Sequence, residues 1–522
     1  MVTSKARDTD ESTAAETRPA VLRVGLLVDS LVLPRWKRRI IEEIAACSVA
    51  RIAVVARRAA PPPRRLRQLL YDAYRGLDYR WFRGEGTDAF APSDASDLLA
   101  DYPRSEAGAL TDLDLDVVVR LGSWCPDGDV ARFGVWSLPD DRDIGFREVM
   151  EARPTTPSFL EIRTGKDAPR VVLVSHSPTD HISIHRTRNH TCWKTAEFVT
   201  RALRDVAHDG PAVLEGEDAP AARPRPGNLL VCGLLARLAL RYGRRKVLEL
   251  VTHEQWYPAY RFEAQARPPA DAFAGLTRLI PPKDRFWADP FPFVKDGRTY
   301  LFLEELPYRR GKGHISVMEI DAEHGAREPV TVLKRDYHLS YPFVFEWQGE
   351  VYLLPETSAD RKVQLFRCRS FPDAWEEDRV LLDGVNAVDA TLAEVDGRWW
   401  MFVNIGAPGA GNWDELHLYW ADSPLGPWTP HRRNPVKSDC RAARPAGRLF
   451  RWQGQLYRPA QNCSGAYGAA IALQKILRLT PDAYAEEHVA DLVPEWAERA
   501  HTLNTGTGLH VVDALQRRRR FL

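Results

Sequence analysis

Lys295-Asp-Gly-Arg-Thr-Tyr300 is the first of four related segments in the carboxyl-terminal half of this 522-residue chain. In each segment a glycine is followed three residues later by an aromatic residue, and successive glycines are 52, 48 and 57 residues apart. Asp-Gly and related pairs supply the positive φ that a tight hairpin turn requires. Each repeat is therefore expected to contain a β-hairpin. The pairs are Gly297 and Tyr300, Gly349 and Tyr352, Gly397 and Trp400, and Gly454 and Tyr457.

Repeats of about 50 residues with room for four strands are typical of β-propeller blades. Four such blades fit between about residues 285 and 480. A fifth is expected to combine Glu254–Arg261, before the first repeat, with Gly506–Ala514, after the last. Pairing the two ends in one blade closes the ring and leaves no exposed sheet edge. We therefore predict an all-β five-bladed β-propeller over residues 251–522.

Alignment of the repeats on the glycine brings polar residues to matching positions. Eight residues before the glycine stand Asp289, Tyr341 and Asp389, while the fourth repeat has Arg444 ten residues before it. Because the first strand of each blade lines the channel, we expect such residues to meet at one mouth. Alternatively, they bond neighbouring blades together, since buried polar groups need partners. Seven residues after the glycine stand Glu304, Glu356, Asn404 and Gln461.

Four segments in the blades carry a family resemblance. They are Arg285-Phe-Trp-Ala-Asp-Pro-Phe291, Tyr341-Pro-Phe343, Leu354-Pro-Glu-Thr-Ser358 and Val388-Asp-Ala-Thr-Leu392. This region resembles the propeller at the amino terminus of plant glucosamine inositolphosphorylceramide transferases. More distantly, it is similar to the five-bladed furanosidase propellers of the arabinanase and invertase type. In the plant proteins a later module transfers the sugar, and because this chain ends at Leu522, we do not expect it to carry that activity.

The furanosidase resemblance implies a set of three carboxylates. It implies Asp289 as the nucleophile or base, Glu356 as the general acid, and Asp389 as the residue that fixes the pKa of that acid or holds a sugar hydroxyl. Two carboxyl groups about 5–10 Å apart can serve as acid and base in glycoside cleavage. In the furanosidases the acid usually comes from the third blade, whereas Glu356 lies in the second.

Further substrate contacts are expected around the same channel. Arg444 and Asn462 would hold substrate hydroxyls, and Trp287 would offer a face for stacking. We predict no cofactor and assign no metal ligand, and the seven scattered cysteines form no CxxC pair and so give no zinc site. The sequence does not fix whether a metal ion is required. The expected substrate-binding residues are Trp287, Glu304, Tyr341, Asn404, Arg444, Gln461 and Asn462.

The amino-terminal half shows a different pattern. Two apolar runs, Val21–Val28 and Ile52–Ala56, flank a basic amphipathic segment, and another buried strand is expected at Asp114–Arg120. This order predicts an α/β doubly wound domain over residues 21–205. The order resembles the formyltransferase-like fold, in which an Asn and a His follow the third of these strands. Here Pro139–Asp143 contains neither, so we interpret the domain as a degenerate scaffold.

Residues 206–250 are expected to hold a linker and an amphipathic helix. Residues 208–227 are rich in Pro and Gly, and residues 228–250 are rich in Leu, Arg and Lys. The helix either packs against one domain or makes peripheral contact with an anionic membrane surface. It is too short an apolar run to span a bilayer, which needs about 20 apolar residues.

Charge and composition limit the function classes. With 72 basic and 71 acidic residues the formal net charge is +1, which argues against a nucleic-acid partner. Residues 1–20 are polar and lack an apolar core, so we expect a disordered tail and not a signal peptide. Together with the scattered cysteines, this predicts a cytoplasmic protein.

These observations predict a carbohydrate-active protein, namely a glycoside hydrolase or transglycosidase that acts on a sugar-containing metabolite or glycolipid. Two alternatives stay open: a non-catalytic module that binds a glycan or lipid headgroup, and a formyl or acyl transferase. Carboxylates gathered around one pocket would favour an enzyme, whereas pairing with arginines or backbone amides would favour a binding or structural role. The sequence does not fix the sugar, the acceptor or the oligomeric state.

Overall fold

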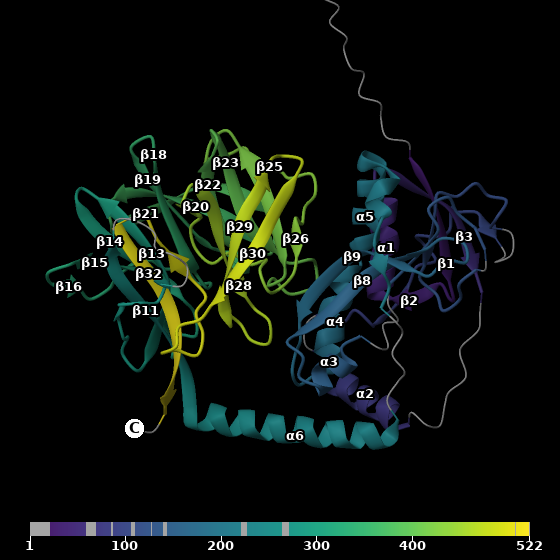
Figure 1. The fold of residues 1–522 in the computed structure, drawn as a ribbon, viewed down its shortest axis with the longest axis horizontal. Helices are drawn as coiled ribbons and strands as arrows, with labels where there is room; N and C mark the ends of the chain where they lie inside the picture. Colours follow the sequence, from purple (N-terminus) through teal and green to yellow (C-terminus); the bar gives the residue numbers. More distant parts are fainter. Residues whose placement is uncertain are drawn as a thin grey trace, which may run out of the picture.

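The protein has two parts, a mixed-sheet part and a β-propeller, joined by one long helix (Figure 1). The helix is α6 (Asn228–Val251), which runs along one edge of the molecule from the first part to the second. The expected tail at residues 1–20 and the segment Pro139–Asp143 lie outside the described residues. The computed structural model describes residues 21–58, 69–84, 87–105, 110–126, 128–138, 144–220, 227–263, 271–506 and 508–520.

Five separate sheets form the propeller, which confirms the predicted five blades. Four blades consist of strands that follow one another in the chain, as the repeat predicts. Blade 1 contains β13 (Arg285–Lys295), β14 (Arg298–Pro307), β15 (His314–Asp321), β16 (Gly325–Ala326) and β17 (Val330–Leu333). Blade 2 contains β18 (Ser340–Trp347), β19 (Glu350–Glu356), β20 (Lys362–Ser370) and β21 (Ala374–Asp383), with the 3₁₀ turn η4 (Ser358–Asp360) between β19 and β20. Blade 3 contains β22 (Ala387–Val395), β23 (Arg398–Ile405), β24 (Glu415–Ala421), β25 (Thr429–Pro430) and β26 (Lys437–Ser438). Blade 4 contains β27 (Phe450–Trp452), β28 (Gln455–Asn462), β29 (Ala470–Leu479) and β30 (Tyr484–Leu492).

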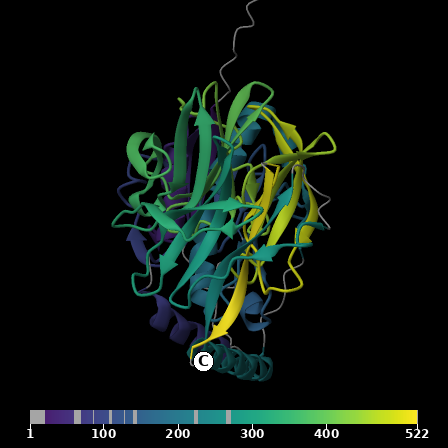
Figure 2. The same ribbon diagram turned by 90° about the vertical axis from the view of Figure 1, so that its left-hand side faces the viewer.

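The fifth blade closes the ring with strands from the two ends of the propeller. β11 (Thr252–Glu263) pairs antiparallel with β32 (Gly508–Arg519) along their whole length. The short strands β12 (Thr277–Arg278) and β31 (Leu503–Asn504) complete this sheet. This pairing confirms the expected shared blade, and in Figure 2 β32 descends beside the end of α6.

Each of the four predicted hairpins closes on a turn with two consecutive residues of positive φ. In the first turn φ is 51° at Asp296 and 75° at Gly297. A turn whose two central residues both have positive φ is a type I′ turn, and its twist matches that of the flanking strands. The same pair of angles recurs at Gln348-Gly349, Asp396-Gly397 and Gln453-Gly454. The structure therefore confirms the predicted hairpins.

The first strands of blades 1 to 3 share a β-bulge. Pairing with the second strand is interrupted after Ala288, Ser340 and Val388, and the next residue in each case has positive φ. These residues are Asp289 with φ 49°, Tyr341 with φ 46° and Asp389 with φ 56°. Left-handed backbone at a residue other than glycine is strained, and such strain is concentrated at functional sites. The repeated bulge thus distinguishes the positions that the alignment selected.

The amino-terminal part is built on a mixed sheet in the order β10-β9-β8-β7-β6-β1-β3-β5. The pairs among β7, β6, β1, β3 and β5 are parallel, and those among β7, β8, β9 and β10 are antiparallel. The strands are β1 (Leu22–Val28), β3 (Ala50–Arg57), β5 (Arg104–Ser105), β6 (Val117–Arg120), β7 (Val135–Ser137), β8 (Thr155–Arg163), β9 (Arg170–Pro178) and β10 (Glu217–Asp218), with β2 (Val32–Pro34) and β4 (Pro92–Asp94) as a separate pair.

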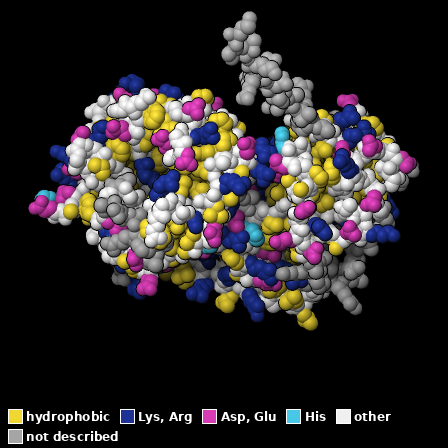
Figure 3. All heavy atoms as spheres, turned by 45° about the horizontal axis from the view of Figure 1, so that its top comes forward, with side chains coloured by type: hydrophobic (Ala, Val, Ile, Leu, Met, Phe, Trp, Pro, Cys, Tyr) yellow, Lys and Arg dark blue, Asp and Glu magenta, His cyan; other side chains and the backbone are white. Residues whose placement is uncertain are grey.

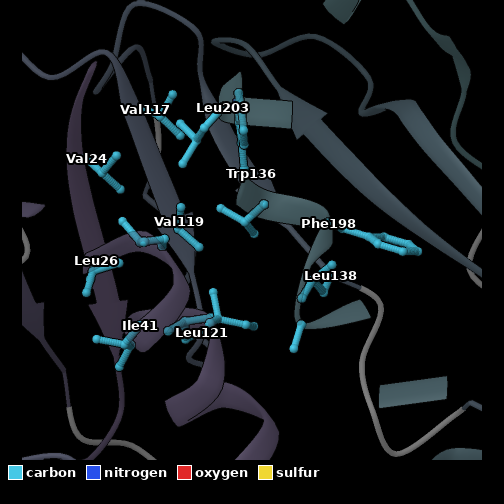
Figure 4. Close-up of a cluster of buried hydrophobic side chains, with 14 of the residues drawn as sticks. Val24, Leu26, Ile41, Val117, Val119, Leu121, Trp136, Leu138, Phe198 and Leu203 are labelled. Atoms are coloured by element: carbon cyan, nitrogen blue, oxygen red, sulfur yellow. The ribbon is translucent and has the colours of Figure 1, made fainter. Parts of the chain in front are cut away.

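Within the described residues, the helices cover only one face of this sheet. α1 and α5 pack on it in a core that includes Val24, Val119 and Trp136 (Figure 4). The opposite face is covered by irregular segments around Leu115 and Val130. This differs from a doubly wound sheet. The sheet also extends beyond residue 205, because its last strand is β10 at Glu217–Asp218. The helices are α1 (Arg35–Ala45), α2 (Leu69–Phe82), α3 (Phe146–Met150), α4 (Ile184–Thr195) and α5 (Phe198–Asp209), followed by the 3₁₀ turn η2 (Pro211–Leu214).

Buried ion pairs join the two parts. Lys194 Nζ lies 2.6 Å from Asp414 Oδ2, and both side chains are fully buried. His190 Nε2 lies 3.0 Å from the same oxygen. Nearby, Arg201 binds Glu415 at 2.7 Å. Because one partner of each pair comes from α4 or α5 and the other from blade 3, these bonds fix the propeller against the sheet. None of the helices in the described ranges is long and apolar enough to cross a membrane.

Candidate functional site

Four carboxyl groups from three blades gather near the propeller axis. Glu304 is buried, and burial together with the charges of Asp289, Glu356 and Asp389 raises its pKa well above the ordinary value. An effect of three carboxylates on a fourth requires that they be close to it. The structure thus brings together the three residues expected as catalytic and adds Glu304, which was expected only to bind substrate.

Arg444 of blade 4 joins two of these carboxylates. Its Nε donates to Asp389 Oδ2 at 2.5 Å, and its Nη2 lies 3.6 Å from Glu356 Oε2. Gln461 Nε2 also donates to Asp389, at 2.9 Å. Burial raises the pKa of Asp389 to about 7 even though Arg444 opposes the shift. Near neutral pH this carboxyl is therefore poised between its two protonation states.

Glu356 is the least buried of the four carboxylates. Its two oxygens accept hydrogen bonds from Ser340 Oγ at 3.0 Å and from Ser358 Oγ at 2.6 Å. Its side chain is 10% exposed, compared with 1% for Asp389. Of the group, it is therefore the one most open to an incoming molecule.

Asp289 is instead bonded into the junction of blades 5 and 1. Its Oδ1 accepts a hydrogen bond from Thr502 Oγ1 at 2.7 Å and lies 3.2 Å from His501 Nε2. Its Oδ2 accepts the backbone N–H of Tyr341 at 3.2 Å. Burial opposes ionisation of Asp289, but the nearby imidazolium of His501 and these hydrogen bonds lower its pKa. Both oxygens are thus in use, which favours the structural alternative for this residue.

His501 lies between two carboxylates. Its Nδ1 is 3.0 Å from Asp513 Oδ2, on the side opposite Asp289. Burial alone would lower the pKa of His501, but Asp513 and Asp289 together raise it to about 10. Asp513 also accepts the backbone N–H of Asp289 at 3.1 Å. A carboxylate–imidazolium–carboxylate chain therefore ties the closing blade to the first.

Asp513 was missed in the sequence, although a signal for it exists. It stands seven residues after Gly506, the same offset at which the other four blades carry Glu304, Glu356, Asn404 and Gln461. The alignment stopped at four repeats because the fifth blade is split between distant segments. His501 has no such signal, since no equivalent histidine occurs in the other repeats.

Asp289, His501 and Asp513 also satisfy the geometry of a metal site, since their ligand atoms all lie within 4.8 Å of one another. Their hydrogen bonds favour a structural role instead, because both carboxylates accept backbone N–H groups and Asp289 also accepts the hydroxyl of Thr502.

Two expected substrate-binding residues lie within the wall of the propeller. Trp287 packs in a core between blades 5 and 1 with Leu301 and Val511, so it offers no face for stacking. Tyr341 is fully buried, and its hydroxyl accepts the N–H of Gly447 at 2.6 Å. The strand pattern could not separate these wall positions from channel positions, because the bulge beside them reverses the alternation of faces.

The two remaining amides differ in their bonding. Asn404 is fully buried, and neither polar atom of its side chain has a hydrogen-bond partner within the described part of the chain. Asn462 is bonded to its own blade and the loop after it: its Nδ2 lies 3.3 Å from Asp491 of β30, and its Oδ1 accepts a hydrogen bond from Ser464 Oγ at 2.6 Å. Only Asn404 therefore keeps free hydrogen-bonding capacity.

A cavity of about 1090 Å³ lies between the two parts. It adjoins the end of the propeller at which Tyr467 contacts Arg444, and we call this end the propeller mouth. Blades 3, 4 and 5 form one wall, and α4, the end of β9 and α6 form the other. Seven arginines but only three acidic residues line it. The arginines are Arg186, Arg241, Arg244, Arg245, Arg499, Arg517 and Arg520.

Tyr467 separates this cavity from the carboxylates. It lines the cavity, and its ring lies 5.0 Å from the guanidinium carbon of Arg444 on the other side. Trp413, a second aromatic residue of the lining, lies 5.6 Å from it between ring centres. None of the four carboxylates borders the cavity directly. A ligand in the cavity would therefore meet the aromatic pair first and reach the carboxylates only beyond Tyr467.

The second part of the chain matches a known family. Residues 275–519 match the family described as glucosamine inositolphosphorylceramide transferase 1, N-terminal. The proteins of that name from Oryza sativa subsp. japonica and Arabidopsis thaliana are 38% identical over 236 residues and 35% identical over 211 residues. These alignments cover 44% and 39% of this chain but only 31% and 27% of the relatives, so the chain spans about a third of their length.

The class of the second part is thus a five-bladed β-propeller. Residues 275–519 are similar to the amino-terminal region of those transferases, which confirms the resemblance. Among solved structures, the family 117 glycoside hydrolase Zg3597 of Zobellia galactanivorans is 13% identical, with TM-score 0.32 over 52% of this chain and 91% of its own. The β-xylosidase/α-arabinofuranosidase CoXyl43 from a compost metagenome is 12% identical, with TM-score 0.34 over 50% and 94%. At these scores neither likeness bears on function. The formyltransferase-like resemblance of the amino-terminal part stays a prediction.

Proposed function

We propose that this carbohydrate-active protein binds an anionic carbohydrate, such as the phosphate-bearing headgroup of a glycolipid, in the cavity above the propeller mouth. The observation that carries the proposal is the composition of the lining, in which seven arginines face three acids beside an aromatic pair. Arginine binds phosphate and carboxylate groups through paired, charge-assisted hydrogen bonds. Aromatic rings such as those of Tyr467 and Trp413 supply stacking faces for sugars.

Arg241 is the residue best placed to bind the anionic group. Its Nη2 donates to the backbone oxygens of Val149 and His181, at 2.6 and 2.8 Å, and its buried Nε has no partner within the described residues. Burial lowers the pKa of Arg241. This is the direction expected for a cation taken from water without an anion beside it. A bound phosphate would supply that anion.

A titration with a matched pair of ligands tests this proposal. We expect the full chain to bind myo-inositol 1-phosphate at least tenfold more tightly than myo-inositol, because only the first offers an anion to the arginines. The substitutions Arg241→Gln and Arg244→Gln should each weaken binding of the phosphate about tenfold. Arg298→Gln is the matched control, since this exposed arginine lies at the hairpin turn of blade 1. Equal binding of both ligands, or loss in the control alone, would refute the proposal.

Glycoside hydrolysis or transfer is the second candidate, and the shifted pKa values favour it. Glu304, held protonated, would give its proton to the departing sugar oxygen as the glycosidic bond breaks. Glu356 would take a proton from the water or hydroxyl that forms the new bond, so that the exchange balances. The assignment of the acid thereby moves from Glu356 to Glu304. No observation favours the formyl- or acyl-transfer alternative.

The variant Glu304→Gln distinguishes carbohydrate binding alone from glycoside hydrolysis or transfer. If catalysis occurs, Glu304→Gln should abolish product formation from a panel of glycosides and glycolipids, read by mass, while binding of myo-inositol 1-phosphate is retained. If no member of the panel is converted by the unaltered protein, the binding function alone remains.

A further inference from the structure

Helix α6 packs against the protein along a narrow face. Val231, Leu234 and Leu238 are its buried residues, and they join a small core with residues of α2, α3 and α4 such as Tyr71 and Phe146. The helix otherwise bridges the two parts along the lower edge of Figure 1. Most of its surface is therefore in contact with solvent.

The face opposite this core is apolar as well. At about 100° per residue, Leu229, Leu240 and Val247 point away from the buried side, and Leu250 and Val251 flank them. Leu229 is 91% exposed, Leu240 76% and Leu250 69%. We call Leu229, Leu240, Val247, Leu250 and Val251 the outer stripe. In Figure 3 hydrophobic side chains project along the lower edge of the molecule, with Lys and Arg side chains beside them.

Cations border the outer stripe on both sides. On the helical projection Arg237 and Arg244 fall on one border and Lys246 on the other. Glu249 is the sole acid of the helix, and it is neutralised by Arg245 at 2.7 Å and Lys246 at 2.8 Å. Further arginines adjoin the end of the helix, because Arg520 at the end of β32 donates its backbone N–H to Val251 at 3.0 Å. The surface around the stripe is therefore positively charged.

We propose that α6 is an interfacial membrane-binding helix, whose outer stripe enters the headgroup boundary of an anionic bilayer. Transfer of the exposed leucine side chains from water into the bilayer is favourable, and the flanking cations attract acidic headgroups. Helices that lie in the membrane plane have both properties. Charge complementarity is what favours a bilayer over a second copy of this chain, since two cationic borders brought together would repel each other.

The same helix forms a wall of the basic cavity. Arg241, Arg244, Arg245 and Leu248 line the cavity, while the outer stripe faces away from it. A bilayer bound to the stripe would therefore lie next to the cavity at headgroup level. The membrane contact itself does not depend on what the cavity binds, so it can be measured without any soluble sugar ligand.

Co-sedimentation of the full chain with vesicles tests this inference. We expect the unaltered protein to bind vesicles of phosphatidylcholine with 30% phosphatidylserine, and to bind phosphatidylcholine alone more weakly. The double variant Leu240→Asp/Val247→Asp should bind both kinds of vesicle at least tenfold more weakly. Leu477→Asp, at an exposed leucine of blade 4, is the matched control and should bind as the unaltered protein does. Lys246→Gln should weaken binding to the anionic vesicles about fivefold and leave binding to phosphatidylcholine unchanged.

Two results would overturn it. The first is that the unaltered chain, shown to be folded by its thermal transition, does not sediment with anionic vesicles. The second is that light scattering finds a dimer that Leu240→Asp/Val247→Asp converts to a monomer, without any vesicle binding. That outcome would assign the outer stripe to self-association.

Discussion

At the scale of single residues, the ionisable groups near the axis fall into two sets with opposite behaviour. His501 and Asp289 are stabilised in their charged forms by each other, whereas Glu304 and Asp389 are forced by burial toward their neutral forms. His501 and Asp289 hold blades 5 and 1 together. Glu304 and Asp389 can carry protons near Glu356. Each set has its own dependence on pH.

The stability contributed by His501 should decrease in alkaline solution. Its pKa is raised from 6.5 to about 10 in the folded state, so the stabilisation is complete below about pH 6.5 and is lost as the pH rises toward 10. Urea unfolding at pH 6.5 and 9.5 should therefore show a larger loss for the unaltered protein than for His501→Gln. An equal loss in both would mean that the imidazole is neutral in the fold.

Replacement of Glu304 should instead raise the stability of the fold, and should do so more strongly at higher pH. Because burial raises the pKa of this carboxyl, the folded state must keep a proton that the unfolded chain releases above about pH 4.5. Glu304→Gln removes this cost and retains the shape of the neutral acid. We expect its melting temperature to exceed that of the unaltered protein by an amount that grows from pH 5 to pH 8. A difference independent of pH would contradict a protonated Glu304.

At the scale of secondary-structure elements, the hairpins depend on backbone conformation that only a few residues adopt. Gly397 has φ 76° at the second position of its turn, whereas Gly76 lies within α2 with nothing within 4 Å of an added Cβ. Gly397→Ala should therefore lower the free energy of unfolding by about 1 kcal/mol, and Gly76→Ala should raise it by a similar amount. Chemical denaturation of both variants measures this, and the same sign in both would refute the argument.

Most of the propeller could be predicted at this scale, because each turn, each strand and each aligned polar residue is encoded locally. The bulge at Asp289 could not, since residues 287–293 are all buried and a change in the alternation of faces is not visible in a continuous buried run. Nor could the core position of Trp287 or the role of His501. The basic cavity was beyond prediction because it unites α4, α6 and three blades, which are distant in the sequence.

At the scale of the whole molecule, the cavity exists only while the two parts stay docked. Lys194 and His190 hold the pKa of Asp414 well below its ordinary value although burial opposes them, which shows how strongly the buried carboxylate depends on its partners. Lys194→Met removes the ammonium group from this buried carboxylate, leaves His190 as its remaining ion-pair partner and should cost about 3–5 kcal/mol. We expect its unfolding to become two-step and binding of myo-inositol 1-phosphate to weaken. Arg298→Gln, far from the interface, should unfold as the unaltered protein does.

Whether an anionic carbohydrate occupies the cavity above the propeller mouth can be observed in a crystal structure of the full chain with myo-inositol 1-phosphate. We expect density for the phosphate about 3 Å from the guanidinium groups of Arg241 or Arg244, with the ring beside Tyr467. Density at another surface of the propeller, with the cavity filled only by solvent, would contradict it.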